Sequence, residues 1–343
     1  MFVVGVDGGS TKTIALVADD RGRILAAARG GGSNWTGENV EVPMKVVVDT
    51  FRDATGRAGL TGEQITLGVF TLAGADWPED HTRREEFLGK AGIAQRVRVK
   101  NDSFGGLRAG LRKPYGMVLA AGTGMNAAVI APDGTEWAFG YYENFGGAAS
   151  MVRDVFSAVL RAEDGRGQPT LLTWMMLNHL DYPTVEAMLR ASVLHRLDYG
   201  KFYAFAPLVF EAALKGDRIA VEILVHQGKG LAEYATAMAR RFKMTEIEFD
   251  IVLAGSLFKG VGPLLIDTIT QEVHQVAPRA RIVRAHFEPA IGSVLLAYDA
   301  LGIEVTGAIY ARLAETTPDA KLFDTSRSSR AAPMSSEDDE EEE

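Results

Sequence analysis

The stretch VVGVDGGSTKT, residues 3–13, joins a short apolar run to a cluster of Gly, Ser, Thr and Lys. Backbone N–H groups in a glycine-rich turn can converge on phosphate oxygens, because glycine lets the backbone approach without a Cβ clash. Three phosphate-binding turns share this appearance: the P-loop, the dinucleotide-binding turn, and a turn between two antiparallel strands. The segment that follows the turn distinguishes them.

Residues 11–19, TKTIALVAD, are rich in β-branched and apolar side chains and predict a strand. A dinucleotide-binding turn must instead open a helix. A P-loop also opens a helix and requires the spacing G-x-x-x-x-G-K-[ST], whereas Lys12 here follows Thr11. The context therefore excludes both and favours a hairpin turn.

The same pattern occurs twice along the chain. The first half predicts the order β-β-β-α-β-α-β-α, with strands at 1–7, 11–19, 23–30, 64–74 and 96–102 and helices at 41–58, 81–91 and 103–113. The second half predicts strands at 115–124, 125–134, 135–142, 249–255 and 280–286, helices from 147 to about 242, and helices at 256–276 and 289–302. Residues 116–137 repeat the strand and turn pattern of residues 3–24, which indicates a duplicated unit.

Composition limits the kinds of chemistry available. The chain of 343 residues exceeds the usual size of a single core, so two domains are expected. It contains no cysteine, which excludes disulfides, thiolate nucleophiles, Cys-based zinc sites and iron–sulfur clusters. No segment is apolar for long enough to cross a bilayer, and no signal peptide precedes the first strand, so a cytoplasmic protein without membrane contact is expected.

Charge is concentrated at the C-terminus. The acidic run at 337–343 carries −7 of the formal net charge of −9, which leaves the rest of the chain nearly neutral. A near-neutral remainder offers no basic excess for nucleic acid, so no nucleic-acid partner is expected. Residues 315–343 are predicted to form a disordered acidic tail.

Eight motifs in order carry a family resemblance: GVDGGSTKT (5–13), GSNW (32–35), LAGAD (72–76), KNDSFGGL (100–107), AAGTGMNA (120–127), LKGDRIAVEIL (214–224), LAGSLFKG (253–260) and EPAIGSVLLA (288–297). Over residues 1–305 the sequence resembles the sugar kinase/Hsp70/actin superfamily, and within it the BadF/BadG-type ATPase family, in the branch that includes the N-acetylglucosamine kinases. The resemblance implies an α/β fold of duplicated ribonuclease-H-like (actin-like ATPase) domains, each with a mixed β-sheet flanked by helices, and ATP in the cleft between them.

The expected domains are 1–113, completed by the helix near 288–302, and 114–287 with a helical insertion. The resemblance implies ATP and Mg²⁺ as cofactors, with Asp7 helping to hold the metal through water, as suits an ion that keeps much of its hydration shell. The implied ATP-binding residues are Gly8, Gly9, Ser10, Thr11 and Lys12 in the first turn, Gly122, Thr123 and Gly124 in the second, Gly255 and Ser256 beside the adenosine, and Lys259.

Asp102 is the candidate general base. It ends the predicted strand 96–102, and the matching aspartate is the base in the kinases that the chain resembles. A carboxylate there would accept the hydroxyl proton and orient the nucleophile. The alternative is that Asp102 only caps the helix that begins at Ser103.

Sugar-contact residues are also implied by the resemblance: Asn34, Trp35, Gly74, Asp76, Asp102, Asn126, Glu143 and Asn144. Trp35 can pack against a sugar face, or it can be a partly buried loop anchor. The amino-sugar kinases carry an aspartate before the long helix, and here the segment YYENFGGAAS (141–150) places Asn144 at that position. The missing negative charge predicts an altered sugar or a reduced activity.

The resulting hypothesis is an ATP-dependent kinase of an amino or N-acetylamino hexose. The alternative is an ATP-binding sugar sensor or weak ATPase of the same family. The activator ATPases of 2-hydroxyacyl-CoA dehydratases hold an iron–sulfur cluster through cysteines, so the absence of cysteine argues against that role. A homodimer is compatible with the sequence, because LLTWMMLNHL (171–180) fits either a core or a dimer face.

Overall fold

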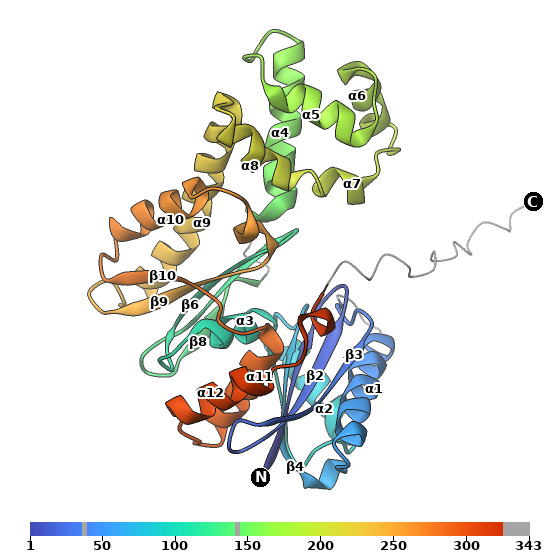
Figure 1. Ribbon diagram of the computed structural model, residues 1–343, viewed down its shortest axis with the longest axis vertical. Helices are drawn as coiled ribbons and strands as arrows, with labels where there is room; N and C mark the ends of the chain where they lie inside the picture. Colours follow the sequence, from blue (N-terminus) through green and yellow to red (C-terminus); the bar gives the residue numbers. More distant parts are fainter. Residues whose placement is uncertain (36–39, 141–144, 325–343) are drawn as a thin grey trace, which may run out of the picture.

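The computed structural model describes residues 1–35, 40–140 and 145–324, and it places two five-stranded sheets in two lobes (Figure 1). Glu143, Asn144 and the tail residues 325–343 lie outside the described residues. The two lobes match the expected α/β fold with duplicated mixed sheets. The predicted domain boundaries stay a proposal.

The first sheet confirms the hairpin interpretation of the opening turn. The strand after the turn pairs antiparallel with the strand before it, and the register joins Gly8 to Thr13. The order in the sheet is β3-β2-β1-β4-β5, with β4 parallel to β1 and β5 parallel to β4. The strands are β1 (Phe2–Gly8), β2 (Thr13–Asp19), β3 (Ile24–Gly30), β4 (Ile65–Leu72) and β5 (Val97–Asn101).

The second sheet repeats this topology, which confirms the duplication. Its order is β10-β9-β6-β7-β8, with β6 antiparallel to β7 and parallel to β9, just as β1 is antiparallel to β2 and parallel to β4. The strands are β6 (Gly116–Ala121), β7 (Met125–Ile130), β8 (Glu136–Ala138), β9 (Phe249–Ala254) and β10 (Ala280–Arg284). Each sheet therefore carries one glycine-rich hairpin turn at the end of its central strand.

Helices cover both sheets and separate them. In the first lobe α1 (Glu41–Arg57) packs on β2 and β3, and α2 (Pro78–Lys90) packs on β5. Helix α2 begins three residues before the predicted start because Pro78 occupies its first turn, where a missing N–H costs nothing. Between the sheets lie α3 (Ser103–Gly110) and α11 (Pro289–Ala300), which pack on each other (Figure 1).

The prediction of one continuous helix over residues 256–276 is wrong. The chain forms a 3-10 turn at Ser256–Lys259 and then α10 (Leu264–His274). The break falls on Gly260-Val261-Gly262-Pro263, where Gly262 has φ +86° and the proline cannot continue a helix from the preceding turn. Two short elements replace the long helix.

A helical insertion between β8 and β9 completes the second lobe (Figure 1). It comprises α4 (Gly147–Glu163), α5 (Leu171–Leu180), α6 (Val185–Val193), α7 (Tyr199–Tyr203), α8 (Ala206–Leu214) and α9 (Arg218–Arg241). Helix α5 buries Met175 and Met176 in the core but leaves Trp174 69% exposed, so the segment has both a core face and an open face. The homodimer stays a prediction. Among the described helices, none combines the length and apolarity needed to span a membrane.

Two glycines bring α3 and α11 into backbone contact. A Cβ built on Gly292 of α11 would lie 1.9 Å from the carbonyl oxygen of Gly105 in α3. No side chain fits in that space, so the helices cross with their backbones touching. This crossing lies in the apolar core between the sheets, to which Leu107, Val118 and Val294 contribute.

The predicted tail begins too early in the sequence, because residues 315–324 are not disordered. Helix α12 (Gly307–Thr316) is followed by a turn at Ala320–Leu322, and Phe323 packs into the core between the sheets with 8% of its surface exposed. The Arg29 guanidinium donates to the carbonyls of Leu322 (2.8 Å) and Asp324 (2.7 Å). An isolated aromatic residue thus anchors a segment whose composition alone predicts disorder.

Two truncations test this boundary. Ending the chain at Asp324 should leave the free energy of unfolding unchanged, whereas ending it at Thr316 should lower that energy by about 2 kcal/mol, because Phe323 is lost from the core. Urea unfolding followed by fluorescence measures both. Equal midpoints for the two truncated chains would contradict the anchoring role of Phe323.

Candidate active site

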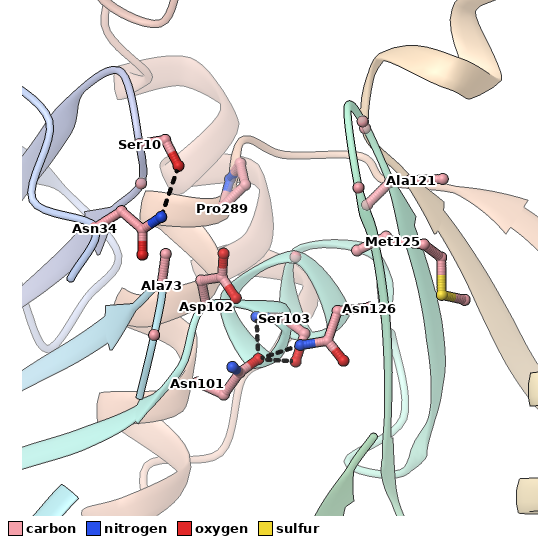
Figure 2. Close-up of a pocket in the computed structure, with 18 of the residues that line it drawn as sticks. Ser10, Asn34, Ala73, Asn101, Asp102, Ser103, Ala121, Met125, Asn126 and Pro289 are labelled. Carbon is pink, nitrogen blue, oxygen red and sulfur yellow. Dashed lines mark hydrogen bonds between the residues drawn. The ribbon is translucent and has the colours of Figure 1, made fainter. Parts of the chain in front are cut away.

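A cleft of about 610 Å³ opens between the two glycine-rich turns. Figure 2 shows Ser10 and Asn34 on one side of it, Ala121 and Met125 on the other, and Asp102 between them. The structure thus brings most of the predicted residues together. Those that line the cleft are Asp7, Gly9, Ser10, Asn34, Gly74, Asp76, Asp102, Gly122, Thr123, Gly124, Asn126 and Gly255.

The first turn is held by its own backbone and by the following loop. Gly9 N–H donates to the Lys12 carbonyl (2.9 Å), and the Gly9 carbonyl accepts from the N–H groups of Ser33 (2.9 Å) and Asn34 (3.2 Å). The Asn34 amide also donates to the Ser10 hydroxyl (3.0 Å; Figure 2). Among the described residues, none accepts a hydrogen bond from the N–H groups of Ser10 and Thr11, so these donors are available to an anion.

The second turn has the same character. Gly122 N–H donates to the Gly124 carbonyl (2.9 Å). In the first turn of α4, the N–H groups of Ala148 and Ala149 donate to the carbonyls of Gly122 (2.8 Å) and Thr123 (2.9 Å). Within the described part of the chain, the N–H groups of Thr123 and Gly124 have no acceptor. Both sides of the cleft therefore offer free backbone donors.

The end of β9 closes the cleft beside the second turn. Gly255 has φ +99°, and a Cβ there would lie 2.3 Å from the Ala121 carbonyl oxygen, so only glycine fits. Ser256 and Lys259 follow in the 3-10 turn and do not line the cleft. Of the three ATP-binding residues predicted in this segment, Gly255 therefore lines the cavity.

Four further predicted residues do not line the cleft: Gly8, Thr11, Lys12 and Trp35. The Lys12 ammonium donates to the Phe323 carbonyl, which holds it against the C-terminal segment. Burial lowers the pKa of Lys12, and the nearby carboxylates of Glu288 and Asp7 oppose that shift.

Asp102 stands at the N-cap position of α3, but its carboxylate makes no capping hydrogen bond. The cap comes from Asn101, whose Oδ1 accepts from the Ser103 N–H (3.0 Å) and from the Ser103 hydroxyl. This geometry gives the cap to Asn101 rather than to Asp102, although interaction with the Ser103 N–H lowers the pKa of Asp102. Burial, and then the charge of Asp76, raise the pKa of Asp102 to about 6.

Asp7, the last residue but one of β1, shares this environment. Burial raises the pKa of Asp7 to about 7, and the charge of Asp102 adds to the shift. Two carboxylates that share a poorly solvated cleft favour a bound cation, which would lower both pKa values again. The described residues contain no group of three His, Asp or Glu side chains that could hold a metal ion by themselves.

Asn101 hydrogen-bonds two of the predicted sugar-contact residues, and the sequence analysis did not identify it. Its amide donates to Asp76 Oδ1 (2.6 Å), and its Oδ1 also accepts from the Asn126 amide (3.0 Å; Figure 2). The available signal was a polar residue at the last position of a strand, directly before the candidate base. Sequence alone did not reveal its partners, which lie on two other elements.

Trp35 has a buried cationic neighbour that the sequence also did not reveal. The Arg84 guanidinium of α2 lies 5.4 Å from the centre of the Trp35 ring and donates to the Trp35 carbonyl (3.1 Å). Arg84 is 1% exposed. These contacts favour the loop-anchor interpretation of Trp35, which fixes the loop that carries Asn34.

Duplicated sheets of identical topology, with facing glycine turns across one cleft, define the class of actin-like ATPases. A sequence profile of the BadF/BadG/BcrA/BcrD ATPase family matches residues 4–297, and the chain belongs to this family. It is 25% identical over 313 residues to the N-acetyl-D-glucosamine kinase of Dictyostelium discoideum, covering 86% of this chain and 97% of that one.

One further relative and one solved structure extend the comparison. The N-acetylmuramic acid/N-acetylglucosamine kinase of Clostridium acetobutylicum is 23% identical over 300 residues, covering 86% of this chain and 98% of that one. A glucokinase of the ROK family from Streptomyces griseus, solved with glucose and AMPPNP, is 16% identical with a TM-score of 0.52, covering 86% and 99% of the two chains. The latter similarity bears on the fold alone.

Proposed function

We propose that this protein is an ATP-dependent kinase that phosphorylates a hydroxyl of an amino or N-acetylamino hexose. The observation that supports this proposal most strongly is the position of Asp102. Its carboxylate makes no capping hydrogen bond and faces a cleft between two turns whose backbone N–H groups are available to a ligand. The relatives named as kinases of N-acetylglucosamine and N-acetylmuramic acid supply the substrate class.

The two turns would hold the nucleotide. Free N–H groups of Ser10 and Thr11 on one side, and of Thr123 and Gly124 on the other, suit the oxygens of a triphosphate. Gly255 would lie against the adenosine, with Ser256 and Lys259 next to it. The conformation of the two phosphate-binding turns would depend on their remaining residues, Gly8, Gly9, Lys12 and Gly122.

Magnesium, held by Asp7 through water, would neutralise charge on the β- and γ-phosphates when bound. Asp102 would accept the proton of the sugar hydroxyl while the hydroxyl oxygen forms a bond to the γ-phosphorus. The bond from that phosphorus to the bridging oxygen breaks, and ADP leaves. Little covalent assistance is needed, so the protein contributes mainly alignment and charge neutralisation.

The sugar would lie between Asp102 and the polar side chains of Asn34, Asp76 and Asn126. These groups line the cleft and supply both donors and acceptors for hydroxyls. Gly74 lines the same wall, and Trp35 would act through the loop it anchors. Glu143 and Asn144 complete the proposed set. Closure of the lobes 1–113, with 288–302, and 114–287 would exclude water and favour transfer over hydrolysis.

An ADP-coupled assay over a panel of hexoses tests the proposal. We expect ADP release that depends on an added amino or N-acetylamino hexose and exceeds the rate with ATP alone. Sugar binding by calorimetry without sugar-dependent turnover would instead establish the sensor alternative. Equal ADP release with and without every sugar would also reject the kinase.

The pH profile gives a separate prediction. Because the pKa of Asp102 is raised to about 6, its carboxylate becomes protonated as the pH falls through that value and can no longer accept a proton. We expect kcat/KM for ATP, which reports the free enzyme, to fall about tenfold per pH unit below pH 6, with circular dichroism as the control for acid unfolding. Bound Mg²⁺ would move the corresponding limb of kcat to lower pH. An acid limb of kcat/KM near pH 4, the ordinary range of aspartate, would contradict the assignment.

A further inference from the structure

We infer that Asn101 is a positioning residue of the proposed kinase site: its side-chain amide links the two lobes and caps α3, which leaves the Asp102 carboxylate free to face the sugar hydroxyl. This inference rests on the proposed function. It assigns the residue next to the base a role distinct from that of the base.

The contacts of Asn101 use both the nitrogen and the oxygen of its amide. The residue ends β5 and is 3% exposed. Its Nδ2 donates to Asp76 Oδ1 (2.6 Å), and its Oδ1 accepts from Ser103 N–H (3.0 Å), from the Ser103 hydroxyl and from Asn126 Nδ2 (3.0 Å). One buried amide thus organises three neighbours, and its loss would leave buried polar groups without partners.

These neighbours come from both lobes. Asp76 follows β4 of the first sheet, whereas Asn126 belongs to β7 of the second. The Asn126 Oδ1 accepts from the N–H groups of Ala127 (2.8 Å) and Gly140 (3.2 Å), which turns its Nδ2 towards Asn101 (Figure 2). The orientation of both amides is therefore fixed by donors and acceptors that cannot be exchanged.

The cap is the step that connects Asn101 to the base. The N–H of Ser103 needs an acceptor at the start of α3, and Asn101 provides one. Without that oxygen, the carboxylate of Asp102 is the adjacent acceptor, and it would turn from the cleft towards the helix end. A base displaced by about 1 Å loses on the order of 100-fold in rate.

Charge gives the arrangement a measurable signature. Burial raises the pKa of Asp76, Asp80 adds to the shift, and the Asn101 hydrogen bond opposes it. The charge of Asp76 in turn raises the pKa of Asp102. The Ser103 N–H already lowers the pKa of Asp102. In Asn101→Ala this N–H would no longer be shared with Asn101, so it would lower the pKa of Asp102 further. Loss of the Asn101 hydrogen bond would also make Asp76 easier to protonate, which lowers the pKa of Asp102 as well. Asn101→Asp keeps an acceptor for the cap but adds a negative charge, which raises it.

The experiment compares Asn101→Ala and Asn101→Asp with wild type, using Asn178→Ala on the exposed face of α5 as the matched control. Titration of the Asp102 carboxyl by ¹³C NMR should give a midpoint below that of wild type in Asn101→Ala and above it in Asn101→Asp. Steady-state rates should show kcat lowered about 100-fold in Asn101→Ala with the KM for ATP unchanged. In Asn101→Asp, the acid limb of the pH–rate profile should move to higher pH than in wild type.

The outcomes separate the two claims. If the titration midpoint of Asp102 equals that of wild type in both variants, or shifts in the same direction in both, the positioning role is overturned, even if the protein is an active kinase. Opposite shifts in a protein without sugar-dependent turnover would support the positioning role and reject the proposed function. Loss of folding in Asn101→Ala alone leaves the isosteric Asn101→Asp titration as the deciding measurement.

Discussion

Asp102→Asn is expected to lower kcat for sugar phosphorylation by about 10²- to 10⁴-fold, the usual contribution of a positioned general base. The amide preserves the shape of the side chain but accepts no proton. Asp102 makes no capping hydrogen bond, so α3 keeps its cap from Asn101 and the fold should be unaffected. The KM for ATP should stay within about twofold, because the nucleotide is proposed to lie on the two turns.

Initial rates at saturating ATP and sugar measure this effect. Asp53→Asn is the matched control, because Asp53 is an exposed partner of Arg57 on α1, away from the cleft. It should leave kcat unchanged. A kcat for Asp102→Asn within about threefold of wild type would remove Asp102 from the mechanism.

Gly292→Ala is expected to destabilise the fold by about 3 kcal/mol, the upper part of the usual range for overpacking. The added Cβ would lie 1.9 Å from the Gly105 carbonyl oxygen and 2.8 Å from the Ala109 nitrogen, so α3 and α11 must separate. Their separation would also disturb the start of α3, which carries the base. The loss of stability should therefore be accompanied by a loss of activity.

Guanidinium unfolding of Gly292→Ala and Gly56→Ala provides the comparison. Gly56 lies in α1 and is exposed, and a Cβ there meets no atom within 4 Å. That substitution should stabilise the protein by about 0.5–1 kcal/mol, the helix preference of alanine over glycine. If both variants unfold at the wild-type midpoint, the close crossing of α3 and α11 does not exist in solution.

The fold was predictable where local pattern determines it. The strand after the opening turn excluded two kinds of phosphate loop, and the repeat of that turn at residues 116–137 indicated the second sheet with the same order. The helix at 256–276 was wrong because its break depends on a glycine with positive φ next to a proline. The early start predicted for the tail was wrong because one distant contact, that of Phe323 with the core, overrides composition.

The site was predictable where a motif carries its chemistry. The turn residues and Asp102 were identified from short patterns, and the structure places most of them at one cleft. Asn101 and Arg84 were missed because their importance lies in partners far away in the sequence: Asp76 and Asn126 for one, Trp35 for the other. Such roles follow from tertiary packing, which no single motif encodes.

Transfer of labelled phosphate tests the kinase proposal most directly. The protein is incubated with γ-³²P-ATP, Mg²⁺ and an amino or N-acetylamino hexose, and the products are separated. We predict that the label appears on the sugar at a rate that accounts for the ADP formed, and that Asp102→Asn lowers the rate of this transfer by about 10²- to 10⁴-fold while ATP still binds. Two results would contradict the proposed function. One is label released only as inorganic phosphate, and the other is label that stays in ATP whichever sugar is added.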